Sequence, residues 1–156
     1  MELITTHTHT CFTNHGEGTV EELVSAAVAA GVSTIAVTEH YPMTATFDPD
    51  RYLSMPAERM GEYLAAVEAA REAHPEIEVL VGCEMDWLGD DEDRVITAED
   101  VAPFQLILGS VHLSSTAGLS TTPPSAAAGT RWAPILSGGA TSKCGARPCP
   151  PTRPST

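Results

Sequence analysis

The chain has 156 residues, of which 42% are hydrophobic, and its net charge at pH 7 is −13. This length and apolar content suffice for one domain with a buried core, and no apolar run is long enough to cross a membrane. The N-terminus lacks a basic segment followed by an apolar one, so we expect a cytoplasmic protein without a signal peptide. The four cysteines fit neither a dense disulfide framework nor a Cys-x-x-Cys zinc pattern.

The composition changes abruptly near residue 113. Residues 1–113 contain all 21 acidic residues and all six histidines with only four arginines, a net charge of −17, whereas residues 114–156 contain no acid and carry a charge of +4. An acidic surface of this kind disfavours nucleic acid as a partner. The tail holds seven of the twelve prolines and buries too little apolar surface to offset the entropy of ordering it. We therefore expect a domain over 1–113 and a disordered tail over 114–156.

Strand and helix patterns alternate along residues 1–113. The expected strands are residues 2–6, 34–37, 77–81 and 104–108, and the expected helices are residues 20–30, about 56–73 and a short segment at 98–101. Thr19 and Glu22 form a capping box at the start of the first helix, and Gly31 is its expected end. Strands separated by helices predict an α/β fold made of parallel βα units.

Polar residues that can bind metal lie at or just beyond the C-terminal ends of the expected strands, or in a loop beside them. The candidate ligands are His7, His9, His15, His40, Glu84 and His112. His7 and His9 are two residues apart, so an extended chain presents both imidazoles on one side. The C-terminal ends of parallel strands converge on one face of a β/α barrel, where such barrels build their active sites. Imidazoles with one carboxylate suit zinc, manganese or iron.

Each candidate also has a simpler interpretation. His15 could be exposed in its glycine-containing loop, and His40 and His112 could form local hydrogen bonds at strand ends. Glu84 could pair with an arginine. We expect Asp86 to support the ligands or face solvent, and Glu39 to point to the opposite face of its strand and have a structural role.

A series of short motifs carries these residues. In chain order they are Thr6-His7-Thr8-His9-Thr10, Asn14-His15-Gly16, Val37-Thr38-Glu39-His40, Gly82-Cys83-Glu84-Met85-Asp86 and Gly109-Ser110-Val111-His112. The series resembles the polymerase and histidinol phosphatase (PHP) superfamily, and the Gly-x-Glu-x-Asp-aromatic run at 82–87 resembles its histidinol-phosphatase branch. The resemblance covers about residues 1–113, close to the N-terminal half of a family member. It implies a partial β/α barrel of the distorted, seven-stranded type, with about four βα units present.

The resemblance implies a metal-dependent phosphomonoesterase that hydrolyses L-histidinol phosphate to histidinol and phosphate in histidine biosynthesis. Its partner would be a small phosphate ester rather than nucleic acid or a membrane. Clustered divalent ions lower the pKa of bound water and neutralise phosphoryl oxygens, which also explains how an acidic protein holds a phosphate ester. Two alternatives stay open: another PHP phosphoesterase, such as a nuclease-like domain, and a non-catalytic fragment that binds metal.

The family pattern assigns up to three metal ions to the candidate ligands. It places one ion on His7 and His9 and another on His15 and His40. Glu84 would bridge neighbouring ions, and His112 would complete a neighbouring site. Arg51, in the loop after the second expected strand, is our candidate for a phosphate contact.

The tail departs from the family pattern. A family member continues with further βα units that supply another histidine and an Asp-x-His pair, and residues 114–156 contain neither. We expect the missing ligands to weaken or abolish metal binding and catalysis. Our hypothesis is that the tail is a frameshifted or otherwise miscoded end of a longer phosphatase, and the alternative is a natural linker or interaction tail. The hypothesis fails if no reading frame beyond codon 113 encodes barrel-like strands with an Asp-x-His pair.

Overall fold

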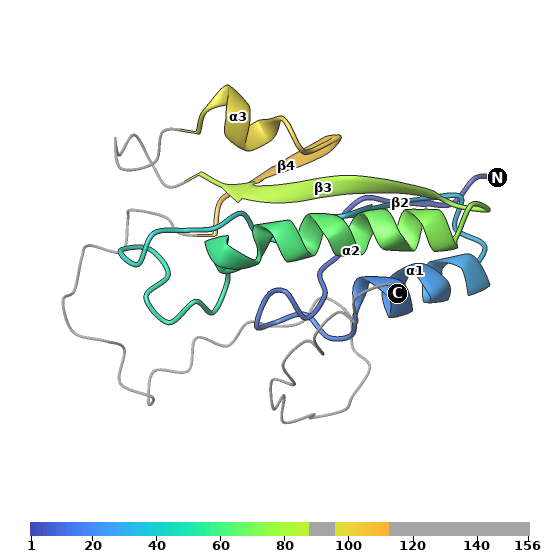
Figure 1. Ribbon diagram of the computed structural model, residues 1–156, viewed down its shortest axis with the longest axis horizontal. Helices are drawn as coiled ribbons and strands as arrows, with labels where there is room; N and C mark the ends of the chain where they lie inside the picture. The colour runs from blue at the N-terminus through green and yellow to red at the C-terminus, as the bar shows by residue number, and fades with distance from the viewer. Residues whose placement is uncertain (88–95, 113–156) are drawn as a thin grey trace.

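The computed structural model describes residues 1–87 and 96–112, and within them one parallel sheet carries the fold (Figure 1). Its strands run in the order β1 (Ile4–Thr5), β2 (Thr34–Val37), β3 (Glu78–Asp86) and β4 (Leu106–Ser110). The helices are α1 (Val20–Ala29), η1 (Ala57–Arg59), α2 (Met60–Ala73) and α3 (Ala98–Val101). All three strand pairs are parallel, so each strand lies beside the next one in the chain.

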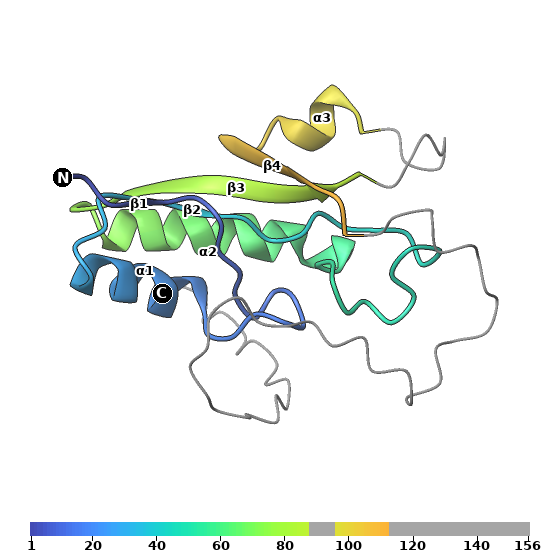
Figure 2. The same ribbon diagram turned by 180° about the vertical axis from the view of Figure 1, so that it is seen from behind.

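The two long helices cover the same face of the sheet. In Figure 1, α1 and α2 lie side by side along β1, β2 and β3, and Figure 2 shows the same layer from behind. The short helix α3 lies beside β4. Parallel strands in sequence order with helical connections form part of a β/α barrel, so the expected fold class is confirmed.

The first helix begins and ends where the sequence indicates. The Thr19 hydroxyl accepts a hydrogen bond from the Glu22 backbone N–H at 3.2 Å, and the Glu22 carboxylate accepts one from the Thr19 N–H at 2.8 Å. These bonds satisfy two backbone donors that a helix start leaves without partners. Gly31 follows the last turn with a φ of +75°, a conformation that glycine adopts without steric cost.

Tyr63 links the helix layer to the sheet. Its ring is 1% exposed, and its hydroxyl lies 2.7 Å from the carbonyl oxygen of Val37 and 2.8 Å from that of Gly82. Burial raises the pKa of the phenol, so the hydroxyl remains a donor between the two carbonyls. Around it lies an apolar core from α1, α2, β2 and β3 that includes Val24, Val37 and Val67.

Strand β3 extends beyond the end expected from the sequence. Its first half pairs with β2, from Glu78 opposite Thr34, and its second half pairs with β4, from Gly82 opposite Leu106 to Asp86 opposite Ser110. The predicted end at residue 81 was therefore too early, because pairing with β4 continues the strand. Glu84 and Asp86 lie inside the strand, two residues apart and on the same face.

Several expectations concern residues outside the described ranges. These are the domain boundary at 113, the disorder of residues 114–156 and the origin of that tail. Within residues 1–87 and 96–112, no helix is both long enough and apolar enough to span a membrane.

The Tyr63 hydroxyl provides a test of how the two layers are joined. Tyr63→Phe removes the donor shared by two buried carbonyls, and we expect it to lower the free energy of unfolding by about 1–2 kcal/mol. Urea unfolding of the full chain measures this change. The matched control is Tyr52→Phe, because the Tyr52 side chain is 62% exposed. Equal stability of the two variants would contradict the linking role of the Tyr63 hydroxyl.

Candidate metal centre

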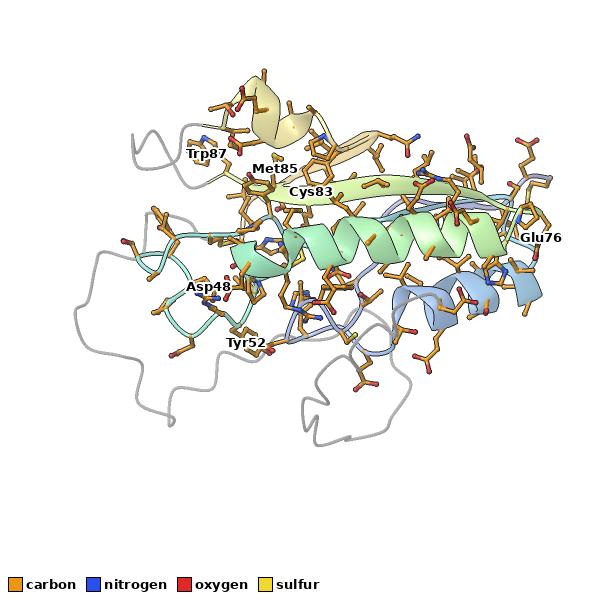
Figure 3. All side chains as sticks on the ribbon, in the orientation of Figure 1. Asp48, Tyr52, Glu76, Cys83, Met85 and Trp87 are labelled. Atoms are coloured by element: carbon orange, nitrogen blue, oxygen red, sulfur yellow. The ribbon has the colours of Figure 1, made fainter. Side chains whose placement is uncertain are left out.

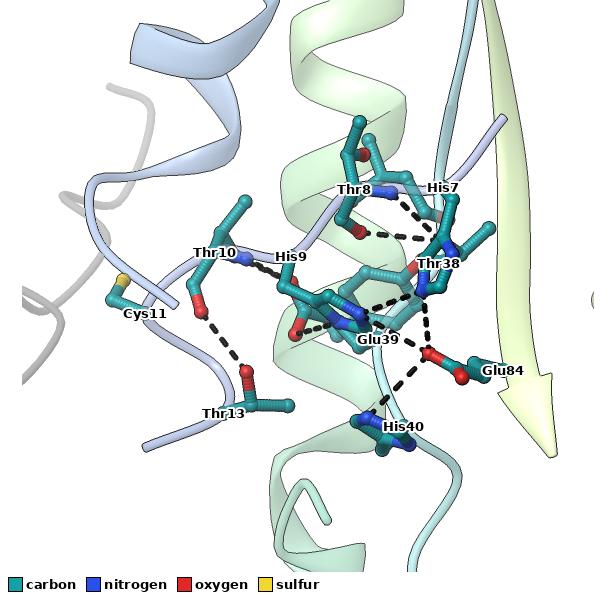
Figure 4. Close-up of polar contacts among 12 residues, drawn as sticks. His7, Thr8, His9, Thr10, Cys11, Thr13, Thr38, Glu39, His40 and Glu84 are labelled. Atoms are coloured by element: carbon teal, nitrogen blue, oxygen red, sulfur yellow. Dashed lines mark hydrogen bonds and ion pairs between the residues drawn. The ribbon is translucent and has the colours of Figure 1, made fainter. Parts of the chain in front are cut away.

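The buried carboxylate of Glu84 lies at the centre of the predicted ligands (Figure 4). Its Oε2 atom is 2.9 Å from Nε2 of His7, 3.1 Å from Nε2 of His9 and 3.4 Å from Nε2 of His40. Its Oε1 atom is 3.7 Å from Nε2 of His112. Four imidazoles from three separate segments of the chain therefore face one carboxylate.

All six predicted ligands belong to compact groups of three, each with its ligand atoms within 4.8 Å of one another. The groups are His9 with His15 and His40, His7 with His9 and Glu84, and His40 with Glu84 and His112. Each group shares residues with another, and Glu84 belongs to two of them. A bridging carboxylate between neighbouring ions would require this kind of sharing.

The chemistry of this donor set fits divalent cations. Nε2 of His7 and Nε2 of His9 are only 3.1 Å apart, and both lie against the same carboxylate oxygen. Lone pairs held this close repel one another unless protons or cations lie between them. Imidazole nitrogen and carboxylate oxygen are the donors that zinc, manganese and iron accept, so these residues fit a metal cluster.

The segment after β1 presents His7 and His9 by turning the residue between them toward β2. The Thr8 N–H donates to Oγ1 of Thr38 at 3.0 Å, and the Thr8 hydroxyl donates to the Ala36 carbonyl at 2.8 Å. Because the segment is extended, the two histidines point away from β2 while Thr8 points toward it. Thr8 therefore holds the two histidines in place.

The loop that carries His15 folds back over the same segment. A Cβ atom at Gly16 would lie 2.1 Å from the carbonyl oxygen of Thr10, so only glycine permits this close approach. The His15 ring lies 4.9 Å from the His9 ring and 5.1 Å from the His40 ring, measured between centroids. Burial lowers the pKa of the His15 imidazole, and repulsion from His9 and His40 lowers it further. The neutral form favoured in this way is the form that binds metal.

Asp86 orients two of the histidines. Its carboxylate lies 2.9 Å from Nδ1 of His40, makes a short contact with Nδ1 of His112, and accepts a hydrogen bond from the Ser110 hydroxyl at 3.0 Å. Burial would raise the pKa of this carboxyl, but its bonds to His40 and His112 hold the pKa well below its usual range. Because Nδ1 of His40 and Nδ1 of His112 both contact Asp86, the two rings direct their Nε2 atoms toward Glu84. Asp86 is thus buried rather than exposed to solvent, and it supports the ligands from behind.

Glu84 is charged within this environment. Burial would raise its pKa, but the nearby His40 and the hydrogen bond with His7 outweigh that effect, and the pKa is lowered. An ionised carboxylate that is 2% exposed, among imidazoles, creates a local attraction for cations.

The Arg51 guanidinium pairs with a neighbour outside the ligand groups. Its Nη1 atom lies 2.6 Å from Oε1 of Glu58, and both side chains are exposed. The Arg51 carbonyl accepts a hydrogen bond from the Asn14 side chain at 2.6 Å, which ties this loop to the loop of His15. Asp48 orders the Arg51 loop further by accepting bonds from the backbone N–H groups of residues 52–54. Figure 3 shows Asp48 and Tyr52 at the same end of the sheet as Trp87.

The remaining histidine, His74, lies outside the ligand groups. Its Nε2 atom is 2.7 Å from Oε1 of Glu21, and its Nδ1 atom is 3.4 Å from Oε1 of Glu76. Figure 3 shows Glu76 at the opposite end of the sheet from Trp87. The hydrogen bond to Glu21 raises the pKa of His74, although part of that effect is offset by desolvation. His74 therefore takes part in a surface contact between α1 and the end of α2.

Comparison with known proteins identifies similar sequences. The PHP domain family matches residues 5–132. A Deinococcus radiodurans protein assigned as a histidinol-phosphatase is 32% identical over 111 residues, which are 70% of this chain and 42% of that protein.

Two solved structures share the fold. A Listeria monocytogenes protein assigned as a histidinol phosphatase superposes with a TM-score of 0.63 at 24% identity, over 70% of this chain and 44% of that protein. A Lactococcus lactis histidinol phosphate phosphatase, solved with zinc, L-histidinol and phosphate, superposes with a TM-score of 0.58 at 23% identity, over 72% of this chain and 41% of that protein. The chain thus spans between 41% and 44% of the length of these relatives.

Asp86 allows a test of how His40 and His112 are oriented. Asp86→Asn keeps the size of the side chain but supplies only one acceptor oxygen, so we expect zinc affinity to fall by about 10–100-fold. Competition with a chromophoric chelator measures the affinity. The matched control is Asp50→Asn, at an exposed aspartate outside the ligand groups, and it should bind zinc as tightly as the wild type. Unchanged affinity in Asp86→Asn would show that the carboxylate does not orient the ligands.

Proposed function

The chain belongs to the PHP domain family, and from that membership we propose that it is a metal-dependent phosphomonoesterase. The observation that carries this proposal is the approach of four imidazoles to the Glu84 carboxylate within three overlapping ligand groups. Such a cluster has the donors and the spacing to hold more than one divalent ion.

The proposed assignment of ligands follows the three groups. Because a neutral imidazole binds only one ion, His7 and His9 would hold one ion and His15 and His40 another, with Glu84 bridging neighbouring ions and His112 completing a neighbouring site. Bound divalent ions would activate a water molecule and neutralise the negative charge of the phosphoryl oxygens. Zinc, manganese and iron are all compatible with these ligands, and the zinc in the Lactococcus lactis structure makes zinc the first metal to test.

The proposed substrate is L-histidinol phosphate, which the enzyme would convert to histidinol and phosphate. This reaction would belong to histidine biosynthesis, and the proposed location is the cytoplasm. The name of the Deinococcus radiodurans relative and the L-histidinol and phosphate in the Lactococcus lactis structure support this choice. The charge of −17 over residues 1–113 favours a small monoester over a nucleic acid, because an acidic surface repels a polyanion.

Arg51 is the proposed contact for the substrate phosphate. The hydrogen bond from Asn14 keeps its backbone next to the loop of His15. The guanidinium would have to exchange its exposed partner Glu58 for the phosphate, and an exposed ion pair of this kind contributes little energy.

A second candidate function is metal binding without turnover. It is favoured by the openness of the ligand groups, since the His7 side chain is 57% exposed and that of His112 is 38% exposed.

Substitution of Glu84 distinguishes the phosphatase from a protein that only binds metal. We expect the zinc- or manganese-loaded full chain to release phosphate from histidinol phosphate, and Glu84→Gln to lose more than one ion and to slow release by about 100-fold or more. Elemental analysis and a phosphate-release assay measure the two effects. The matched control is Glu78→Gln, because Glu78 is an exposed glutamate on the same strand.

The outcomes of this experiment are distinct. Bound metal without phosphate release would favour the non-catalytic function, and cleavage of an unrelated phosphodiester would favour a nuclease-like enzyme. A wild-type chain that takes up no metal would contradict the proposed centre.

A further inference from the structure

Two buried polar atoms next to the ligand groups lack hydrogen-bond partners. Within residues 1–87 and 96–112, the buried side-chain nitrogen and oxygen atoms without a partner are Nδ1 of His9 and Oε2 of Glu39. The two atoms lie 3.9 Å apart, just beyond hydrogen-bonding distance. Buried polar groups almost always have partners, so two of them facing each other indicate a missing interaction between them.

Glu39 is held firmly on its other side. Its Oε1 atom accepts hydrogen bonds from the backbone N–H of Thr10 at 2.6 Å and from the Thr10 hydroxyl at 2.7 Å. The Glu39 side chain is fully buried, and these two bonds leave Oε2 as the oxygen directed at His9. The bonds to Thr10 agree with the expected structural role of Glu39, but the carboxylate also lies against the segment that carries His9, close to a candidate ligand (Figure 4).

We propose that Glu39 is a positioning residue for His9: its Oε2 atom accepts a hydrogen bond from Nδ1–H of His9 when Nε2 of His9 binds a divalent ion. The role rests on the metal centre proposed above. A small movement of the His9 ring, about 1 Å, brings Nδ1 and Oε2 into hydrogen-bonding range.

The chemistry of imidazole requires such a partner. A neutral imidazole carries one proton, so His9 can offer the Nε2 lone pair to a metal only when Nδ1 holds that proton. Nε2 of His9 already faces the ligand group, 3.1 Å from Oε2 of Glu84. A buried Nδ1–H without an acceptor would disfavour this tautomer, and Glu39 is the acceptor within reach.

The same arrangement occurs at a neighbouring histidine. His40 places Nδ1 on the carboxylate of Asp86 at 2.9 Å and turns Nε2 toward Glu84 at 3.4 Å. Glu39 thus faces Nδ1 of His9 in the same way that Asp86 faces Nδ1 of His40. The distance from the carboxylate oxygen to Nδ1 is 1.0 Å longer at His9. We infer that metal binding at Nε2 closes the contact between His9 and Glu39.

Glu39→Gln tests this role against a purely structural one. The Gln oxygen can keep both bonds from Thr10, which places the amide NH₂ against Nδ1 of His9. That NH₂ can only donate, so it stabilises the tautomer with the proton on Nε2, which cannot bind metal. We expect zinc affinity to fall by about 10–100-fold while the metal-free protein keeps its fold.

The matched control is Thr10→Val, which removes the hydroxyl donor to Glu39 but leaves Oε2 unchanged. We expect this variant to be less stable than the wild type and to bind zinc with the wild-type affinity. Circular dichroism of the metal-free proteins separates effects on folding from effects on zinc binding.

A nuclear magnetic resonance measurement on the wild-type chain tests the same hydrogen bond without any variant. In ¹⁵N-labelled, zinc-loaded protein we expect His9 to show a protonated Nδ1 with a slowly exchanging proton. A His9 protonated on Nε2, or wild-type zinc affinity in a folded Glu39→Gln variant, would overturn the role of Glu39 while leaving the metal centre intact. If the wild type binds no zinc, the metal centre and the role of Glu39 fail together.

Discussion

The crowding of lone pairs around the Glu84 carboxylate is the constraint on which the site depends. Nitrogen atoms of three imidazoles lie within 3.4 Å of one carboxylate oxygen that is almost completely buried. Such an arrangement is costly in a medium of low polarity unless protons or cations lie between the nitrogen and oxygen atoms. In the proposed function divalent cations would fill this role, and they would also reverse the sign of the potential that an acidic protein presents to a phosphate ester.

The fold supplies this arrangement through the ends of its parallel strands. Pairing of β2 with β3 brings His40 beside Glu84, and pairing of β3 with β4 brings Ser110 beside Asp86. A second layer of polar groups then fixes the ligands, since Thr8 holds the segment between His7 and His9. The candidate ligands at the strand ends are therefore positioned by backbone pairing first and by hydrogen bonds second.

Local patterns in the sequence predicted the elements well, and they also drew attention to the candidate ligands that the structure brings together. The capping box at Thr19 and the glycine at position 31 set the first helix, and all six candidate ligands lie in the three groups. The end of β3 was missed because it depends on pairing with β4, a contact between distant segments. The approach of Glu39 to His9 was missed for a similar reason: strand alternation places Glu39 away from His40, but the His9 segment crosses close to its carboxylate. The sequence left two roles open for Asp86, and the period-two spacing of Glu84 and Asp86 was a signal that favoured support of the ligands over exposure to solvent.

The most direct test of the account is zinc K-edge X-ray absorption of the zinc-loaded full chain. We predict a first shell of nitrogen and oxygen at about 2.0–2.1 Å, with the outer-shell scattering that several imidazoles produce. A shell of water-like oxygens without imidazole scattering, or sulfur at about 2.3 Å, would contradict the centre built around Glu84.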